Sequence, residues 1–310
     1  MKIRLIAALL SLLPLSASAA GIAHHFNGRW GALEVYDARS TLSFRVNLPR
    51  LAERMSPCST FYLPSAVIGL RTGALKLDSE LSWNPERYPA PNYWPASWQR
   101  THNLQSAARA SVPWYLSDLM NRVGAPKLKT ELSALKYGNA DISGGLDQFW
   151  RSSSLQVSGL EQVEFLRALR DGKLGLGANQ VRTLLETLRL EEAEDYTLYG
   201  KTGSCQRGED DYYGLFVGLV EQAGKPRAYF ALNVDGTSVA DVASVRRKIV
   251  MDVLVDLGFW AQPAPVLLIA DGELPVDAPA VDPALAPAVA PAAPTEAAAD
   301  GEAVPVVRGD

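Results

Sequence analysis

The sequence predicts an α+β fold in which strands from both ends of the folded region form one central antiparallel sheet, flanked by helices. Residues 31–46 alternate between apolar and polar side chains about a short turn, as a β-hairpin does. Residues 212–221 and 227–235 are two further β-rich runs, joined by a turn that contains Gly224 and Pro226. The chain between these ends is largely helical, so its strands do not alternate with helices as in a parallel doubly wound sheet.

The composition is that of an ordinary globular protein. The chain has 310 residues, 47% hydrophobic and 21% charged, so it can bury a sizeable core in one large domain or two small ones. Its net charge of −4 offers no basic field, and we expect no nucleic-acid partner. Three His and two Cys are too few for a metal cage or a disulfide-rich scaffold, so we expect no metal and no cofactor. The oligomeric state is left open.

Residues 1–20 have the pattern of a signal peptide. Lys2 and Arg4 form a short positive region, residues 6–15 are mostly apolar, and Ala17-Ser18-Ala19 is a small-residue cleavage signature. A membrane anchor is the alternative, but the apolar stretch is shorter than the roughly 20 residues that a spanning helix needs. We therefore expect export to the periplasm, cleavage near Ala19 and no transmembrane segment.

The other end of the chain, residues 261–310, is predicted to be a disordered tail. From Asp271 onward it consists mainly of Ala, Pro and acidic residues and has no aromatic residue, so it cannot bury enough surface to offset the entropy of ordering. A short apolar run, Val266 to Ala270, precedes it as a possible strand or docking segment. One folded domain over residues 21–260 remains.

The elements of this domain follow from periodicity and capping residues. In chain order they are the hairpin at 31–46, a helical run at 63–70, a helix at 160–169, a strand at 197–203, the strands at 212–221 and 227–235, and a helix at 239–257. Ser158 and Glu161 form a capping box before the second of these helices, whose apolar stripe is core packing. Ser238 is the N-cap of the last helix, and Gly258 ends it.

Three short motifs point to chemistry when they are taken together. Ser59 is expected in the first turn of an apolar helix, where unpaired N–H groups favour developing negative charge. Alone, it is better explained as a capping residue. Tyr137-Gly138-Asn139 alone is a turn, and Lys201-Thr202-Gly203 alone is a weak signal. In this order, however, a serine, Y-G-N and K-T-G are typical of serine penicillin-recognising enzymes.

The chain resembles a class D (oxacillinase-type) serine β-lactamase from about Trp30 to Phe259. The resemblance rests on Pro57 to Phe61, on YGNADISGGLDQFW at 137–150, on LQVSGLEQVEFLRAL at 155–169, on K-T-G at 201–203 and on Arg246 in the last helix. It implies a β-lactamase/transpeptidase-like fold with a helical subdomain. It also implies a ligand that is a β-lactam or a peptidoglycan-like small molecule.

The resemblance also assigns roles to individual residues. Ser59 attacks the lactam carbonyl and forms an acyl-enzyme, and the N–H groups of Ser59 and Ser204 form the oxyanion hole. Trp150 supports the general base. The substrate is held by the residues of the two motifs and by the arginine, namely Asn139, Lys201, Thr202, Gly203, Ser204 and Arg246.

Two positions depart from the family pattern. The S-x-x-K lysine, which carries a carbamate and serves as the general base in class D enzymes, is Tyr62 here, and an ordinary phenol is a poor base at neutral pH. The serine of the S-x-V motif is Ala110, and Ser111, one residue further on, is expected to point elsewhere. We therefore expect greatly impaired or absent β-lactam turnover.

Three hypotheses remain open. The chain is a pseudoenzyme that binds a ligand in the old cleft, a weak or altered enzyme in which a cation such as Lys201 lowers the pKa of Tyr62, or a cell-envelope interaction module tethered by its tail. Trp94, Trp98 and Trp114 are expected to pack in the core, and lining of the cleft is the alternative.

The two cysteines are expected to form a disulfide. Cys58 precedes Ser59, and Cys205 follows Ser204, so each is the neighbour of an implied oxyanion donor. The spacing resembles that of class A carbapenemases, in which a Cys before the nucleophile is bridged to a Cys two residues after K-T-G. Two free, buried thiols are the alternative.

Overall fold

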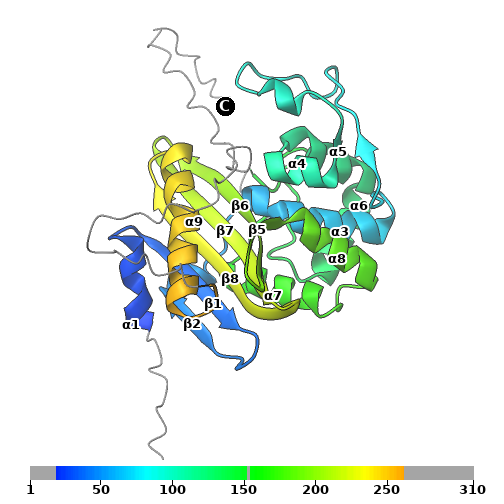
Figure 1. Ribbon diagram of the computed structural model, residues 1–310. Coiled ribbons are helices and arrows are strands. Elements are labelled where there is room, and N and C mark those ends of the chain that lie inside the picture. Colours follow the sequence, from blue (N-terminus) through cyan, green and yellow to red (C-terminus); the bar gives the residue numbers. More distant parts are fainter. Residues whose placement is uncertain (1–18, 152–153, 262–310) are drawn as a thin grey trace, which may run out of the picture. The chain divides into compact units, whose positions relative to one another are not determined.

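The computed structural model describes residues 19–151 and 154–261 (Figure 1). The expected signal sequence up to residue 18 and the Ala/Pro-rich tail, with the run Val266 to Ala270, lie outside the described residues. The described residues include the predicted domain, residues 21–260, apart from residues 152 and 153.

A six-stranded antiparallel sheet forms the centre of the domain. Its strand order is β2-β1-β8-β7-β6-β5. The N-terminal strands β1 and β2 thus lie beside the C-terminal strand β8, as the sequence predicted. The strands are β1 (Gly31–Asp37), β2 (Ser43–Val46), β5 (Arg189–Ala193), β6 (Tyr196–Gly208), β7 (Asp211–Gln222) and β8 (Lys225–Gly236).

The hairpin between β7 and β8 is tighter than the sequence suggested. Its loop is Ala223-Gly224, and both residues have positive φ angles, 50° and 70°. A two-residue loop with φ above zero at both positions matches the right-handed twist of the flanking strands. Gly224 accepts this conformation readily, whereas Ala223 adopts it at some expense in strain. Pro226 consequently lies inside β8.

Both faces of the sheet are covered, which explains the nearly continuous apolar run in β8. Tyr229 and Ala231 are buried in the larger core cluster, and Phe230 and Leu232 in the other. Successive side chains of a strand point to opposite faces, so a strand between two cores needs apolar residues at every position.

Helix α9 (Val239–Asp256) lies across one face of the sheet, and the other helices lie mainly on the opposite side (Figure 1). The Ser238 hydroxyl accepts the N–H of Asp241 and caps α9, as predicted. On the second side, α7 (Gly159–Arg170) begins with the predicted capping box of Ser158 and Glu161.

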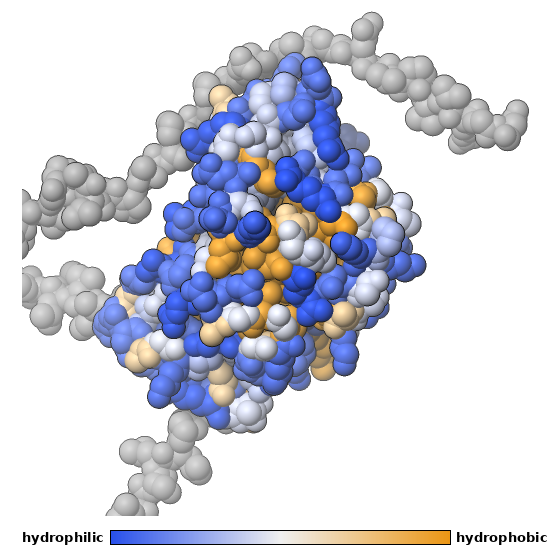
Figure 2. All heavy atoms as spheres, turned by 90° about the vertical axis from the view of Figure 1, so that its right-hand side faces the viewer, coloured by the Kyte–Doolittle hydropathy of each residue, from blue (hydrophilic) through white to orange (hydrophobic). Residues whose placement is uncertain are grey.

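Most of the remaining helices form the expected helical subdomain. Its exposed side is the face shown in Figure 2, where hydrophobic residues gather near the centre and hydrophilic residues surround them. The subdomain contains α3 (Tyr62–Thr72), α4 (Leu104–Ala110), α5 (Pro113–Val123), α6 (Ala125–Ala134) and α8 (Ala178–Thr187). Two short helices lie apart from it, α1 (Ala19–Ile22) near β2 and α2 (Leu48–Ala52) next to β1 and α7. None of the helices in the described ranges is long and apolar enough to cross a membrane.

Candidate active site

A cleft of about 750 Å³ lies beside Ser59. Its walls come from the segment around Ser59, the start of α5, the second half of β6 and α9, together with the loop that precedes α4. Of the residues singled out in the sequence, Cys58, Ser59, Tyr62, Trp94, Trp98, Ser111, Trp150, Thr202, Gly203, Ser204, Cys205 and Arg246 line it.

Ser59 lies in a 3₁₀ turn, η2 (Cys58–Phe61), and helix α3 begins only at Tyr62. We expected Ser59 in the first α-helical turn. Pro64 explains the difference, because it has no N–H to donate to the carbonyl of Thr60 and its ring would collide with that carbonyl. Cys58, just before the serine, has a left-handed backbone with φ of 46°. The serine therefore lies on a sharp, locally strained turn at the edge of the cleft.

Strand β6 runs beside this turn because its edge is open there. Strand β5 pairs only with residues 196–199 of β6, which leaves the following residues of that edge without a partner strand. A Cβ atom added to Gly203 would lie 3.2 Å from the Pro57 carbonyl oxygen and 3.4 Å from Cγ2 of Thr60. The close approach of strand and turn therefore favours glycine at this position of K-T-G.

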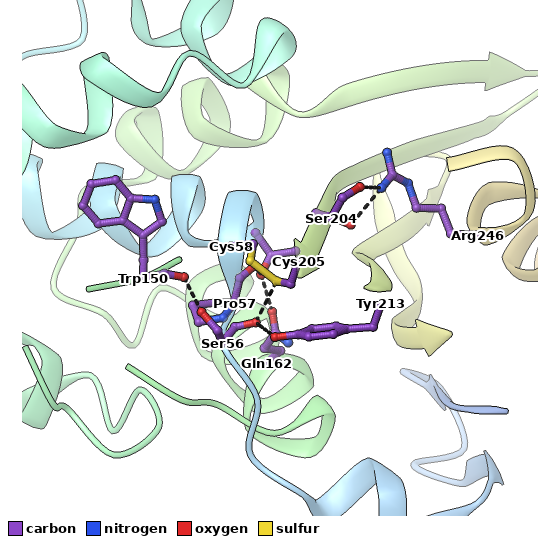
Figure 3. Close-up of a disulfide and its surroundings, with 11 residues drawn as sticks. Ser56, Pro57, Cys58, Trp150, Gln162, Ser204, Cys205, Tyr213 and Arg246 are labelled. Atoms are coloured by element: carbon purple, nitrogen blue, oxygen red, sulfur yellow. Dashed lines mark hydrogen bonds between the residues drawn. A yellow bond between two sulfur atoms is a disulfide. The ribbon is translucent and has the colours of Figure 1, made fainter. Parts of the chain in front are cut away.

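A disulfide joins the turn to the strand, as predicted (Figure 3). Cys58 and Cys205 have Cα atoms 5.9 Å apart, within the range of ordinary disulfides. Their side chains are buried, 5% and 4% exposed, in a small cluster with Met55, Tyr213 and Leu215. The bridge fixes the chain neighbours of Ser59 and Ser204 relative to each other.

The carbonyl of Trp150 holds the turn from the other side (Figure 3). It accepts the N–H of Cys58 at 2.9 Å and the hydroxyl of Ser56 at 2.6 Å. The indole ring is 2% exposed and stacks on Phe61 with an interplanar angle of 15°. The backbone and the ring of Trp150 thus both position the serine segment.

Lys201 is a buried amine directly behind the cleft. Its side chain is 6% exposed, and its Nζ donates to the Ser111 hydroxyl at 2.7 Å and to the Thr202 carbonyl at 2.9 Å. Burial, and then the nearby positive charge of Arg246, lower the pKa of Lys201 to about 7. A substantial fraction of this amine is therefore neutral at neutral pH.

Tyr62 is buried, 1% exposed, and its hydroxyl donates to the carbonyl of Val112 at 2.5 Å. Lys201 Nζ lies 5.6 Å from the centre of its ring. Burial, and then the neighbouring Tyr115, raise the pKa of Tyr62 well above its ordinary value. The phenol is therefore a protonated donor to the backbone, and Lys201 does not make it a base.

Arg246 reaches from α9 to the end of the K-T-G motif (Figure 3). Its Nη1 donates to the Gly203 carbonyl at 2.8 Å and to the Ser204 hydroxyl at 2.6 Å. Burial lowers the pKa of this guanidinium, which nevertheless keeps its charge at any ordinary pH. Among the described residues, neither Arg246 nor Lys201 forms an ion pair, so no carboxylate neutralises either group.

Comparisons with known proteins agree with this architecture. Residues 34–254 match the family model of the penicillin-binding protein transpeptidase domain. The chain is 34% identical over 244 residues to the probable β-lactamase YbxI of Bacillus subtilis, covering 79% of this chain and 87% of the relative. It is 31% identical to β-lactamase OXA-48 of Klebsiella pneumoniae, over 72% and 82% of the two chains.

The chain belongs to the class D family of penicillin-recognising serine proteins. The solved structures that the chain resembles also include a penicillin-receptor domain. The C-terminal domain of the Bacillus licheniformis BlaR penicillin-receptor superposes with a TM-score of 0.71 at 27% identity, over 79% of this chain and 96% of that domain.

One expectation from the class D pattern is wrong. Ser111 was expected to point away from the site, but its hydroxyl lies 2.7 Å from Lys201 Nζ, and the residue lines the cleft. Ser111 follows the end of α4 with a left-handed backbone, φ of 55°, which turns its side chain toward β6. Ala110, at the motif position itself, is exposed, and its carbonyl accepts the indole N–H of Trp98 at 3.1 Å.

The structure does not bring Asn139 to the cleft. Its side chain donates to the Ser154 carbonyl at 2.8 Å and accepts the N–H of Gln156 at 2.9 Å. Gly138 beside it has φ of 62°, and an added Cβ would lie 2.0 Å from the Gln156 carbonyl oxygen. The Y-G-N motif of this class D protein therefore closes the loop that carries Trp150 and does not line the cleft.

The three tryptophans divide into two groups. Trp114 is 1% exposed and packs in the core, as expected. Trp94 and Trp98, whose rings meet edge to face at 5.7 Å, line the cleft instead, and the exposed Tyr93 lies beside them. The sequence signal for this wall was the dense aromatic and proline composition of the region, which does not tell a core from a cleft.

One group of side chains in the described ranges could hold a metal ion. The ligand atoms of His24, His25 and Asp256 lie within 4.8 Å of one another, between the N-terminal turn and α9. His25 Nε2 is already 2.7 Å from the Asp256 carboxylate, and none of the three residues lines the cleft. The group is explained by the hydrogen bond between His25 and Asp256, which attaches the N-terminal segment to α9.

Proposed function

We propose that this protein binds β-lactams, or the peptidoglycan-like molecules that they resemble, through an ester at Ser59, and that it hydrolyses this ester slowly or not at all. The observation that carries the proposal is that the serine turn is intact, whereas the lysine that serves as the family's base is replaced by Tyr62. Ser59, the K-T-G strand and Arg246 share one cleft, whereas Tyr62 is a buried, protonated phenol.

The recognition half of the site supports ligand binding. β-Lactams and the peptides that they mimic carry a carboxylate, for which Arg246 and Thr202 offer a cation and a hydroxyl. The N–H groups of Ser59 and Ser204 belong to two segments that the disulfide and Gly203 hold close together. Preorganised backbone donors of this kind stabilise the oxyanion of a tetrahedral intermediate.

The hydrolytic half of the site supports slow turnover. Removing the ester requires a base to activate water, and the position of the family's base is occupied by a phenol whose pKa lies far above neutrality. Loss of such a group typically slows a step by about 10²- to 10⁴-fold. The proposed acyl-protein therefore accumulates, as it would in a receptor.

Mass spectrometry of the intact protein tests this proposal. After incubation with benzylpenicillin, a mass increase equal to one penicillin that persists for hours supports it, and Ser59→Ala is the control that should remain unmodified. Hydrolysis of a chromogenic cephalosporin by the same sample, compared with that of a Tyr62→Lys variant, measures turnover. Rapid hydrolysis by the wild type that Ser59→Ala abolishes would refute slow turnover.

A pseudoenzyme is the second candidate, in which the cleft binds without a covalent step or the domain serves as an interaction module of the cell envelope. The phenol at position 62 favours it, because it stands where the family pattern has the basic lysine. An unmodified Ser59 after prolonged incubation, together with saturable penicillin binding by calorimetry, supports a non-covalent binder.

We also propose export, with removal of residues 1–19 or 1–20. The positive and apolar pattern of the N-terminus supports it, as does the disulfide, since such bonds persist in oxidising compartments. N-terminal sequencing of protein from its native host should return Ala20 or Gly21, and Met1 would contradict the proposal.

A further inference from the structure

Ser111 contacts Lys201 although it lies one residue after the serine position of the family motif. This contact suggests how Ser59 could lose its proton. Among the described residues, Lys201 is the one amine beside the cleft, and Ser111 is the hydroxyl that connects it to the cleft. Lys201 itself does not line the cleft. A proton that leaves the cleft for Lys201 therefore has a path through the Ser111 hydroxyl.

We propose that Ser111 and Lys201 form the proton-transfer pair of this protein, with Lys201 as the base for acylation of Ser59 and Ser111 as the relay between them. This proposal rests on the proposed function, because it concerns how the same ester is formed. It differs from the class D pattern in which a lysine one turn after the nucleophile accepts the proton.

Three features of the geometry support this assignment. The Lys201–Ser111 distance of 2.7 Å suits a hydrogen bond in either direction, from the ammonium to the hydroxyl or from the hydroxyl to the neutral amine. The Tyr62 hydroxyl is directed to the Val112 carbonyl and does not compete for Lys201. No carboxylate in the described residues pairs with Lys201, so no ion pair favours its protonated form.

The backbone of Ser111 is the fourth feature. A non-glycine residue with φ of 55° is uncommon, and the strain is maintained by neighbouring structure. Here the Ser111 N–H ends α4 by donating to the carbonyls of Ala107 and Ala108, and Pro113 begins α5 two residues later. This short connection between two helices directs the Ser111 hydroxyl to β6, although the motif serine is absent.

The proposed step balances in protons and bonds. As Ser59 Oγ bonds to the lactam carbonyl carbon, its proton passes to Ser111 Oγ, and the proton of Ser111 passes to the neutral amine of Lys201. The intermediate oxyanion is held by the backbone donors. When the lactam C–N bond breaks, the proton returns from Lys201 through Ser111 to the lactam nitrogen, which becomes an amine. Lys201 ends neutral, and Ser59 carries the ester.

Variants at both positions separate a proton-transfer role from a structural one. Ser111→Gly removes the hydroxyl and suits the left-handed backbone, so it isolates the relay from backbone strain. Lys201→Arg keeps the positive charge but cannot act as a base at neutral pH, and Lys201→Met removes both properties. Thermal unfolding of each variant shows that the compared proteins are folded.

The rate of acylation by a fluorescent penicillin should fall about 100-fold or more in all three variants. The double variant Ser111→Gly/Lys201→Met should be no slower than Lys201→Met alone, because residues that act as a unit are not additive. The wild-type rate should rise with pH through about 7, as Lys201 loses its proton, and this inflection should be absent in Lys201→Met. Ala110→Ser should not restore the Ser111→Gly variant.

A second reagent separates failure of this inference from failure of the proposed function. A fluorophosphonate modifies an activated serine without β-lactam recognition, so its reaction at Ser59 reports activation alone. If penicillin fails but the fluorophosphonate labels Ser59 in a Ser111- and Lys201-dependent manner, the inference holds and the β-lactam proposal falls. Wild-type rates in Lys201→Arg or Ser111→Gly with either reagent, or no labelling by either reagent, overturn the inference.

Discussion

Breaking the disulfide is expected to destabilise the domain strongly without altering its fold. Cys58 and Cys205 are separated by 147 residues, so the bridge closes most of the domain into one loop. For a loop of this length, the chain-entropy relation gives about 5 kcal/mol of stabilisation, acting through the unfolded state. A small domain is stable by only about 5–15 kcal/mol in total, so the expected loss is a large fraction of it.

The size of the domain translates this free energy into a temperature. A chain of 150–250 residues loses about 2–4 °C of Tm for each kcal/mol, so the reduced protein should melt about 10–20 °C lower. Two effects contribute to the loss in a Cys58→Ala/Cys205→Ala variant, because it also removes two buried sulfur atoms from the cluster with Met55, Tyr213 and Leu215. Reduction of the wild type leaves these atoms in place, so the difference between the two samples isolates the packing contribution.

Urea unfolding of the oxidised wild type, the reduced wild type and the double variant measures the free-energy contributions of the disulfide and of the packing. Alkylation of thiols in the denatured state, followed by mass spectrometry, confirms the redox state of each sample. The expected order of stability is oxidised wild type, then reduced wild type, then the double variant. A free energy of unfolding for the reduced wild type within 1 kcal/mol of the oxidised value would refute the chain-entropy argument.

Three further outcomes are expected. Tyr62→Phe should lower the free energy of unfolding by about 0.5–1.5 kcal/mol, since it removes the hydrogen bond from the phenol to the Val112 carbonyl. It should leave the acylation rate within about twofold, and a large rate loss would show that the phenol takes part in proton transfer. Burial lowers the pKa of Lys201 to about 7, so between pH 7 and the ordinary lysine pKa the unfolded chain binds more protons at this residue than the folded chain does. The contribution of Lys201 to stability therefore rises with pH, and between pH 7 and 9 the wild type should gain about 2 kcal/mol relative to Lys201→Met. Parallel pH profiles of stability would contradict this prediction. The hydrogen bond from Arg29 lowers the pKa of Asp241 to about 2, so the stability from this pair is present above the ordinary carboxylate pKa and is lost as the pH falls from about 4 to 2. The free energies of unfolding of wild type and Arg29→Met should therefore differ at pH 6 and converge near pH 2. An equal difference at both pH values would rule this out.

The sequence predicts those parts of the fold that local patterns determine. The capping box at Ser158 and the N-cap at Ser238 are short-range features, and both helices start where these residues indicated. The alternation in residues 31–46 likewise predicted the β1–β2 hairpin. The disulfide was predicted from the resemblance, because each cysteine adjoins a residue of a recognised motif.

The features that the sequence did not reveal depend on backbone conformation or on long-range packing. Ser111 contacts Lys201 because of a left-handed residue between two helices, and no spacing rule encodes that φ angle. Pro64 could have predicted the 3₁₀ turn at Ser59, since a proline at that position prevents the first α-helical bond. Trp98 lines the cleft although the aromatic residues and prolines around it suit a core, because its exposure depends on which distant segments pack against it.

Binding of an anionic ligand and activation of Ser59 favour opposite charge states of Lys201. Arg246 lowers the pKa of Lys201, so a ligand carboxylate that neutralises Arg246 raises that pKa again, and by linkage such a ligand takes up protons as it binds. The neutral amine that can accept a proton from Ser59 is therefore the form that an anionic ligand binds less well. One side chain serves two steps that require opposite charge states, and anionic ligands should bind more tightly, but acylate more slowly, as the pH falls below 7.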